Sequence, residues 1–129
     1  MKITSVIARF LLGLIFLVFG LNGFFHFLSM PAPTGVAGQF MGALFVSNFL
    51  IVIFVIQLIG AVLLLVNRYV PLALTLLAPI IVNILLFHLL MAPSGVPVAI
   101  LVALLWVLVF FSVRSAFAGL LQPRVAVAV

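Results

Sequence analysis

The stretch VPLALTLLAPIIVNILLFHLLM, residues 70–91, decides the fold of this chain. It contains 22 residues without a charged side chain, and roughly 20 apolar residues are enough for a helix to cross a hydrocarbon core about 30 Å thick. Inside lipid no water is present to bond the backbone N–H and C=O groups, so a spanning segment of this kind is helical. The stretch therefore predicts a transmembrane helix with few polar groups, among them Asn83 and His88.

Three further apolar stretches of similar length flank this one, at about 6–28, 44–66 and 96–113. The breaks between them hold Pro and Gly residues, which end helices. The loop at 29–43 is still apolar, so a short helix lying in the membrane interface is expected there. After residue 113 the helix is expected to continue along the cytoplasmic surface. The fold is predicted to be all-α, a four-helix transmembrane bundle over residues 1–121 with a flexible C-terminal tail over 122–129.

The composition excludes most enzyme classes. Only 4% of the 129 residues are charged and 70% are hydrophobic, whereas a soluble domain has about 25% charged residues, so a water-soluble domain is excluded. The chain has no Asp, Glu or Cys, which removes carboxylate pairs, the Ser-His-Asp triad, thiolate nucleophiles and thiolate- or carboxylate-held metals. Only His could act as an acid or base near neutral pH. We therefore expect no catalytic activity from this chain by itself.

All the basic residues are predicted to lie on one side of the membrane, because each of them precedes the first span, lies between the second and third, or follows the fourth. They are Lys2, Arg9, Arg68, Arg114 and Arg124. The loops at 29–43 and 92–96 carry no charge. The positive-inside rule then places both termini of this multi-pass protein in the cytoplasm. The net charge of +5 reflects this topology, and without a basic cluster no nucleic-acid partner is expected.

Polar residues inside the predicted spans gather in the outer half of the membrane. Successive helices run in opposite directions and rise 1.5 Å per residue, so the end of the first helix and the end of the third lie at similar depths. Polar groups are costly in lipid and often functional. The candidate ligand-binding residues are Asn22, His26, Gln57, Asn83 and His88.

Three interpretations of these residues stay open. The amides and imidazoles could bond between helices, at about 0.6 kcal/mol for each hydrogen bond. His26 and His88 could flank a haem iron, or one of them could bind the magnesium of a chlorophyll-type pigment, because neutral imidazole is the commonest metal ligand. A quinone or another lipid-like ligand could lie between helices, with His26 and either Asn22 or Gln57 bonding its carbonyl oxygens.

Three segments resemble the DoxX-like family of small four-helix membrane proteins, and the resemblance in the order of elements covers nearly the whole chain. These segments are FGLNGFFHFL (19–28), QLIGAVLLLVNRYVPLAL (57–74) and LLAPIIVNILLFHLLMAPSGVP (76–97). The resemblance implies a four-helix bundle in the bacterial cytoplasmic membrane. It also implies a link to redox chemistry, because some members are subunits of thiosulfate:quinone oxidoreductase and others associate with redox-stress complexes.

The chain departs from this family at two places. Members commonly carry a Glu where this sequence has Gln57, and often a Lys near the end of the first helix, close to His26. Without those charged groups, the proton-coupled or quinone-reducing chemistry of the family has no obvious residues here.

The combined expectation is a non-catalytic accessory or structural subunit of a larger membrane electron-transfer complex. Its expected partners are the lipid bilayer and other membrane-protein subunits, and the redox part rests on family analogy. The alternative is a stand-alone quinone- or haem-binding membrane protein of a redox pathway, centred on the five candidate residues.

Overall fold

Residues 2–128 of the computed structural model are described here, and helices are the only regular elements among them. There are five α-helices, α1 (Lys2–Phe25), α2 (Gly35–Val46), α3 (Phe49–Leu65), α4 (Val70–Leu90) and α5 (Val96–Ser112). Two short 3-10 helices are η1 (Pro93–Gly95) and η2 (Arg114–Leu121). The prediction of an all-helical fold is confirmed. Met1 and Val129, which belong to the predicted domain 1–121 and tail 122–129, lie outside the described residues.

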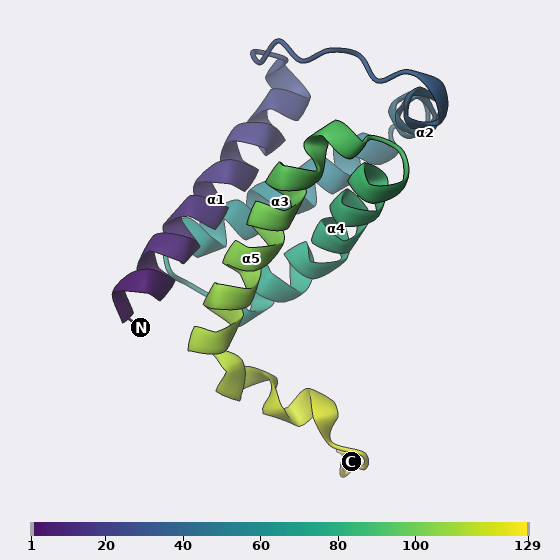
Figure 1. The fold of residues 1–129 in the computed structure, drawn as a ribbon. Coiled ribbons are helices and arrows are strands. Elements are labelled where there is room, and N and C mark those ends of the chain that lie inside the picture. The colour runs from purple at the N-terminus through teal and green to yellow at the C-terminus, as the bar shows by residue number, and fades with distance from the viewer. Residues whose placement is uncertain (1, 129) are drawn as a thin grey trace.

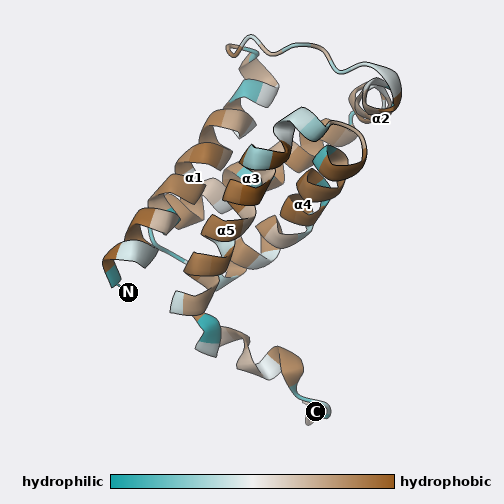
Figure 2. Cartoon of the chain, in the orientation of Figure 1, coloured by the Kyte–Doolittle hydropathy of each residue, from teal (hydrophilic) through white to brown (hydrophobic). Residues whose placement is uncertain are grey.

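Three helical segments are long and apolar enough to cross a membrane. They are α1, α4 and the continuous segment Pro93–Ser112, which joins η1 to α5. The helices α2 and α3 meet the same criterion only as a pair, and their axes differ by 85°. Figure 2 shows the helices hydrophobic along most of their length, with hydrophilic residues mainly near helix ends. By length and composition, residues 2–128 therefore contain three candidate membrane spans, or four if the bent pair counts as one.

Two of the four predicted spans match the structure and two differ at their ends. α4 and α5 agree with 70–91 and 96–113 to within one residue. α1 ends at Phe25 rather than at 28. The prediction of a continuous helix over 44–66 is wrong, because the chain turns at Asn48, whose φ of 63° is left-handed. Asparagine tolerates that conformation better than most residues.

Four helices lie side by side, and each packs mainly against two of the others (Figure 1). α1 packs against α3 and α5, and α4 packs against the same two helices. Apolar side chains from all four fill the space between them, and the largest fully buried ones are Leu12, Leu64, Leu74, Leu77 and Val109. Because lipid tails are as apolar as these side chains, close packing rather than the hydrophobic effect holds such helices together.

Glycines let α1 and α3 approach each other closely. A Cβ atom added at Gly13 would lie 2.9 Å from Cγ of Leu65, and one at Gly20 would lie 2.9 Å from Cδ2 of Leu58. Both distances are too short for an ordinary contact. These glycines therefore bring the backbone of α1 against the side chains of α3, including the turn that carries Gln57.

The two ends of this helix group differ. The N-terminal end of α1, the turn between α3 and α4, and the C-terminal end of α5 lie at one end, whereas α2 and η1 lie at the other (Figure 1). In the α3–α4 turn, Asn67 and Tyr69 have φ values of 56° and 53°. The Arg68 N–H donates to the Leu63 carbonyl across 3.0 Å, so the four residues 66–69 reverse the chain.

The segments outside these four helices pack on their ends. The expected short helix in the loop 29–43 is present as α2, and its Phe40 ring lies 5.8 Å from the ring of Phe87 on α4. Beyond α5 the chain continues in 3-10 form as η2, with the Phe117 ring 5.1 Å from that of Phe110. Residues 122–128 form no helix.

Candidate functional site

Asn22 ends the first helix instead of pointing into an open site. Its side chain is only 8% exposed, and its Oδ1 accepts a hydrogen bond of 2.7 Å from the Leu28 N–H. Its backbone carbonyl accepts another of 2.8 Å from the His26 N–H. Through these two hydrogen bonds, Asn22 thus holds the segment that follows α1 in place.

His26 lies beyond the helix on which the sequence placed it. Its φ of 51° is left-handed, its side chain is exposed, and α1 has already ended at Phe25. His26 therefore does not share a helical face with Asn22. The imidazole is carried by a loop residue just after the C-terminal end of α1.

His88 fits into the turn between α4 and α5. Its Nδ1 lies 3.3 Å from the Ala92 carbonyl oxygen, and its ring meets that of Phe87 edge-on with centroids 5.1 Å apart. A Cβ at Gly95 would collide with the imidazole, so glycine is needed there. The half-buried imidazole helps to hold the turn between α4 and α5 in place.

Asn83 bonds to its own helix. Its side chain is exposed, and its Nδ2 donates a hydrogen bond of 2.8 Å to the Pro79 carbonyl oxygen. Thr75 does the same about two turns earlier, since its Oγ1 donates across 2.9 Å to the Pro71 carbonyl. Both polar side chains are satisfied within α4 and point away from the other helices, so Asn83 does not join the other candidates.

Gln57 is different, because its amide oxygen has no partner. The residue is 7% exposed, and its Oε1 is the only fully buried polar side-chain atom without a hydrogen bond in the described part of the chain. Its Cβ lies 3.7 Å from the position that a Cβ at Gly20 would take. Gln57 therefore faces α1 from the middle of α3.

The five candidates do not form one site. Asn22 and Gln57 belong to α1 and α3, which pack against each other. His26 follows α1, whereas His88 lies in the last turn of α4. The helices α1 and α4 pack mainly against α3 and α5 rather than against each other. No cluster of three potential metal ligands occurs within residues 2–128. Nothing in this arrangement brings the two histidines to one iron.

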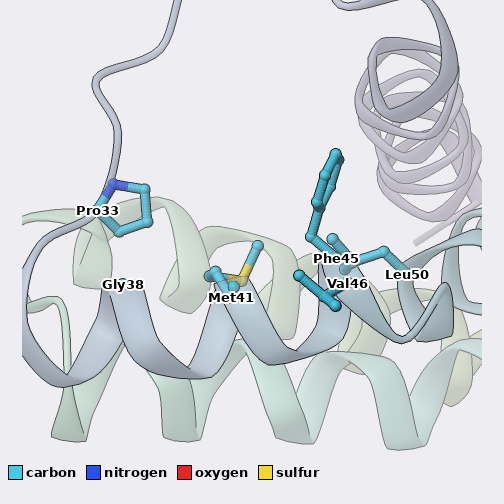
Figure 3. Close-up of a pocket in the computed structure, with 7 residues that line it drawn as sticks. Pro33, Gly38, Met41, Phe45, Val46 and Leu50 are labelled. Atoms are coloured by element: carbon cyan, nitrogen blue, oxygen red, sulfur yellow. The ribbon is translucent and has the colours of Figure 1, made fainter.

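Two apolar grooves lie outside the packed core, and neither is lined by a candidate residue. The first, about 320 Å³, lies between the loop after α1, the helix α2 and the start of α3. Figure 3 shows the side chains of Met41, Phe45 and Leu50 on one side of α2. The second, about 340 Å³, runs along α3 beside Ile59 and Val62. Both grooves are open surface features, and their apolar lining suits contact with apolar groups.

Two polar residues that sequence reasoning did not single out connect helices. The Arg9 guanidinium donates a hydrogen bond to the Leu64 carbonyl at the end of α3. The Trp106 Nε1–H donates across 2.9 Å to the Leu74 carbonyl on α4. An arginine seven residues into an apolar helix and a lone tryptophan in another were the available signals, but sequence spacing alone does not reveal which carbonyl each would reach.

Comparison with known proteins gives no relative for this chain: no protein-family model, no curated protein and no solved structure matches it.

Proposed function

We propose that this chain is a four-pass, DoxX-like integral membrane protein of the inner membrane, with both termini in the cytoplasm. In this proposal it has no catalytic activity by itself. It acts as an accessory subunit, packed against other membrane subunits of an electron-transfer complex.

The proposal rests on the hydrogen-bond partners of the polar side chains of this protein. Asn22, Asn83 and His88 each bond or approach a backbone group of their own chain, so their hydrogen-bonding capacity goes into shaping helices and turns. An active site or ligand site needs polar groups that converge on a shared space. The two grooves are lined by other residues.

The position of the charges supports the four-pass placement. Lys2 begins α1, Arg68 lies in the α3–α4 turn and Arg114 follows α5, and these elements share one end of the helix group (Figure 1). The hydrogen bond from Arg9 to the Leu64 carbonyl joins the first part of α1 to the last turn of α3 at that end. Under the positive-inside rule that end faces the cytoplasm.

The exterior supports the role of a packing partner. Large apolar side chains are exposed along all the helices, for example Leu14 on α1, Val55 on α3, Leu86 on α4 and Leu104 on α5. In a membrane such a surface is covered by lipid or by other helices, and association there depends on close packing. The resemblance to DoxX-like proteins supplies the redox part of the proposal by analogy.

The test is gentle detergent extraction from native membranes, followed by native-gel migration of the 13.9 kDa chain. We expect it to migrate within a larger assembly that contains redox cofactors held by other subunits. The control is the same extract in a harsh detergent, in which the chain should migrate alone. Migration at monomer or dimer size in several mild detergents would falsify the proposal.

The alternative, a stand-alone quinone- or haem-binding protein, is supported by one observation. The buried Oε1 of Gln57 lacks a donor, and a quinol hydroxyl could supply one. Purified protein that keeps a quinone or a Soret absorbance through several mild detergents, and loses it in Gln57→Leu, would favour this alternative over the accessory role.

A further inference from the structure

The helix α2 has an unusual composition for a helix that crosses the end of a membrane protein. Its axis is turned 85° from that of α3. Gln39 is its one side chain with a polar group, and apolar residues such as Val36, Phe45 and Val46 are exposed, Val46 to 80%. A helix at the water interface carries a polar face toward water. A helix that is apolar all round instead belongs in an apolar medium.

The length of α3 gives the depth of α2. α3 has 17 residues, or about 25 Å at 1.5 Å per residue, whereas the hydrocarbon core is about 30 Å thick. With its C-terminal end held beside Arg9 at the charged end, α3 reaches its first residue, Phe49, while still below the opposite headgroups. Only two residues separate the end of α2 from Phe49, so α2 lies at the depth of the acyl chains.

The groove beside α2 has the shape and chemistry for one kind of occupant. The Pro33 carbonyl lies against Gly38 and closes one end, because a Cβ there would come within 2.7 Å of that oxygen. At Gly42, on the same face one turn later, nothing lies within 4 Å of an added Cβ. Met41, Phe45 and Leu50 line this shallow, open stretch of about 320 Å³ with apolar side chains (Figure 3).

We propose that α2 is sunk in the outer leaflet below the headgroups and that its Gly38–Gly42 groove holds one acyl chain of a phospholipid. The inference rests on the four-pass placement proposed above. At this depth no water fills the groove, and an empty one would lose the dispersion contacts of its walls. The groove has no charged residue with which to select a headgroup, so the chain rather than the headgroup is recognised.

The occupant is tested with Gly42→Leu, whose side chain fills the groove without a clash in the fold. Gly119→Leu is the matched control, since Gly119 is equally open and lies in η2, at the opposite end. After purification from dioleoyl-phosphatidylcholine vesicles, native mass spectrometry should show a phosphatidylcholine molecule retained by the wild type and by Gly119→Leu, and lost in Gly42→Leu. Equal retention by all three, or wild-type dimers in place of lipid adducts, overturns the proposal.

The depth is tested separately, because the chain has no cysteine and a single introduced thiol is a unique probe. In phosphatidylcholine nanodiscs, Gly42→Cys should resist a membrane-impermeant maleimide that labels Gly119→Cys. Labelling of both at equal rates overturns the proposal. In sealed vesicles, Ser94→Cys and Arg68→Cys should label from opposite sides; if they label from the same side, the four-pass placement has failed, and the inference with it.

Discussion

The guanidinium of Arg9 donates a hydrogen bond to the backbone carbonyl of Leu64, 55 residues further along the chain. The last carbonyls of a helix have no partner within the helix, and a positive charge beside them is also favourable to the helix dipole. Arg9, a residue of α1, therefore caps a carbonyl at the C-terminal end of α3. It fixes which end of α1 lies beside which end of α3.

Replacing this arginine should loosen the helix pair. A hydrogen bond to a charged group contributes about 1.5–3 kcal/mol, so we expect Arg9→Ala to lower the thermal unfolding midpoint measured by circular dichroism in detergent. Arg9→Lys keeps the positive charge and therefore the topology signal. Its unfolding midpoint should lie between those of Arg9→Ala and the wild type. Arg124→Ala, in the exposed C-terminal segment, is the control and should match the wild type. Equal midpoints for Arg9→Ala and the wild type would contradict this role.

Gln57 should be replaceable with a gain in stability. A buried acceptor without a donor costs about 1–3 kcal/mol, and Oε1 of Gln57 is in that state. We expect Gln57→Met, which has a similar shape, to raise the unfolding midpoint. Gln39→Met on exposed α2 should leave it unchanged. A lower midpoint in Gln57→Met would mean that the amide has a bound partner in the native protein.

Gly23 should be intolerant of even a methyl group. A Cβ there would collide with the ring of Phe54 on α3, and overpacking costs about 1–3 kcal/mol, against about 1 kcal/mol gained from helix propensity. We expect Gly23→Ala to lower the unfolding midpoint, and the double variant with Phe54→Leu to recover part of the loss. Gly42→Ala, in open space, should not lower it. An additive double variant would contradict the proposed contact.

Asn22 and Asn83 should respond differently to the same substitution. Asn22→Ala leaves the Leu28 N–H without its partner in a partly buried place, for an expected loss of about 1 kcal/mol. It should also increase protease cleavage in the loop 29–34. Asn83→Ala removes an exposed bond within α4 and should be close to neutral. Equal losses of stability in Asn22→Ala and Asn83→Ala would contradict this prediction, because burial of the hydrogen bond would then make no difference.

The sequence predicted the helices best where Pro and Gly mark their ends. Pro71 and Pro97 lie in the first turns of α4 and α5, and those spans were predicted within a residue. The ends of α1 and α3 were missed because they depend on His26 and Asn48 taking left-handed backbone conformations. Such conformations follow from local hydrogen bonds that hydropathy does not report.

Counting residues predicts how far along a helix each candidate residue lies, but not the direction in which its side chain points. Residue counting placed Asn22, Gln57 and Asn83 in one half of the membrane. It did not show that Asn83 faces outward while Gln57 faces α1. The direction of a side chain depends on which helices are neighbours, and an apolar helix that can be buried on any side does not reveal its neighbours through periodicity.

The tight turn at residues 66–69 has a consequence for how the chain is made. α3 and α5 have 17 residues each, fewer than α1 and α4, and α3 follows a break in the chain. Only four residues separate it from the longer α4, so the two helices are expected to leave the translocon together as a hairpin. In a chain that stops after residue 69, a cysteine in place of Arg68 should then fail to label from the side on which Lys2 lies, whereas in a chain that includes α4 it should label from that side.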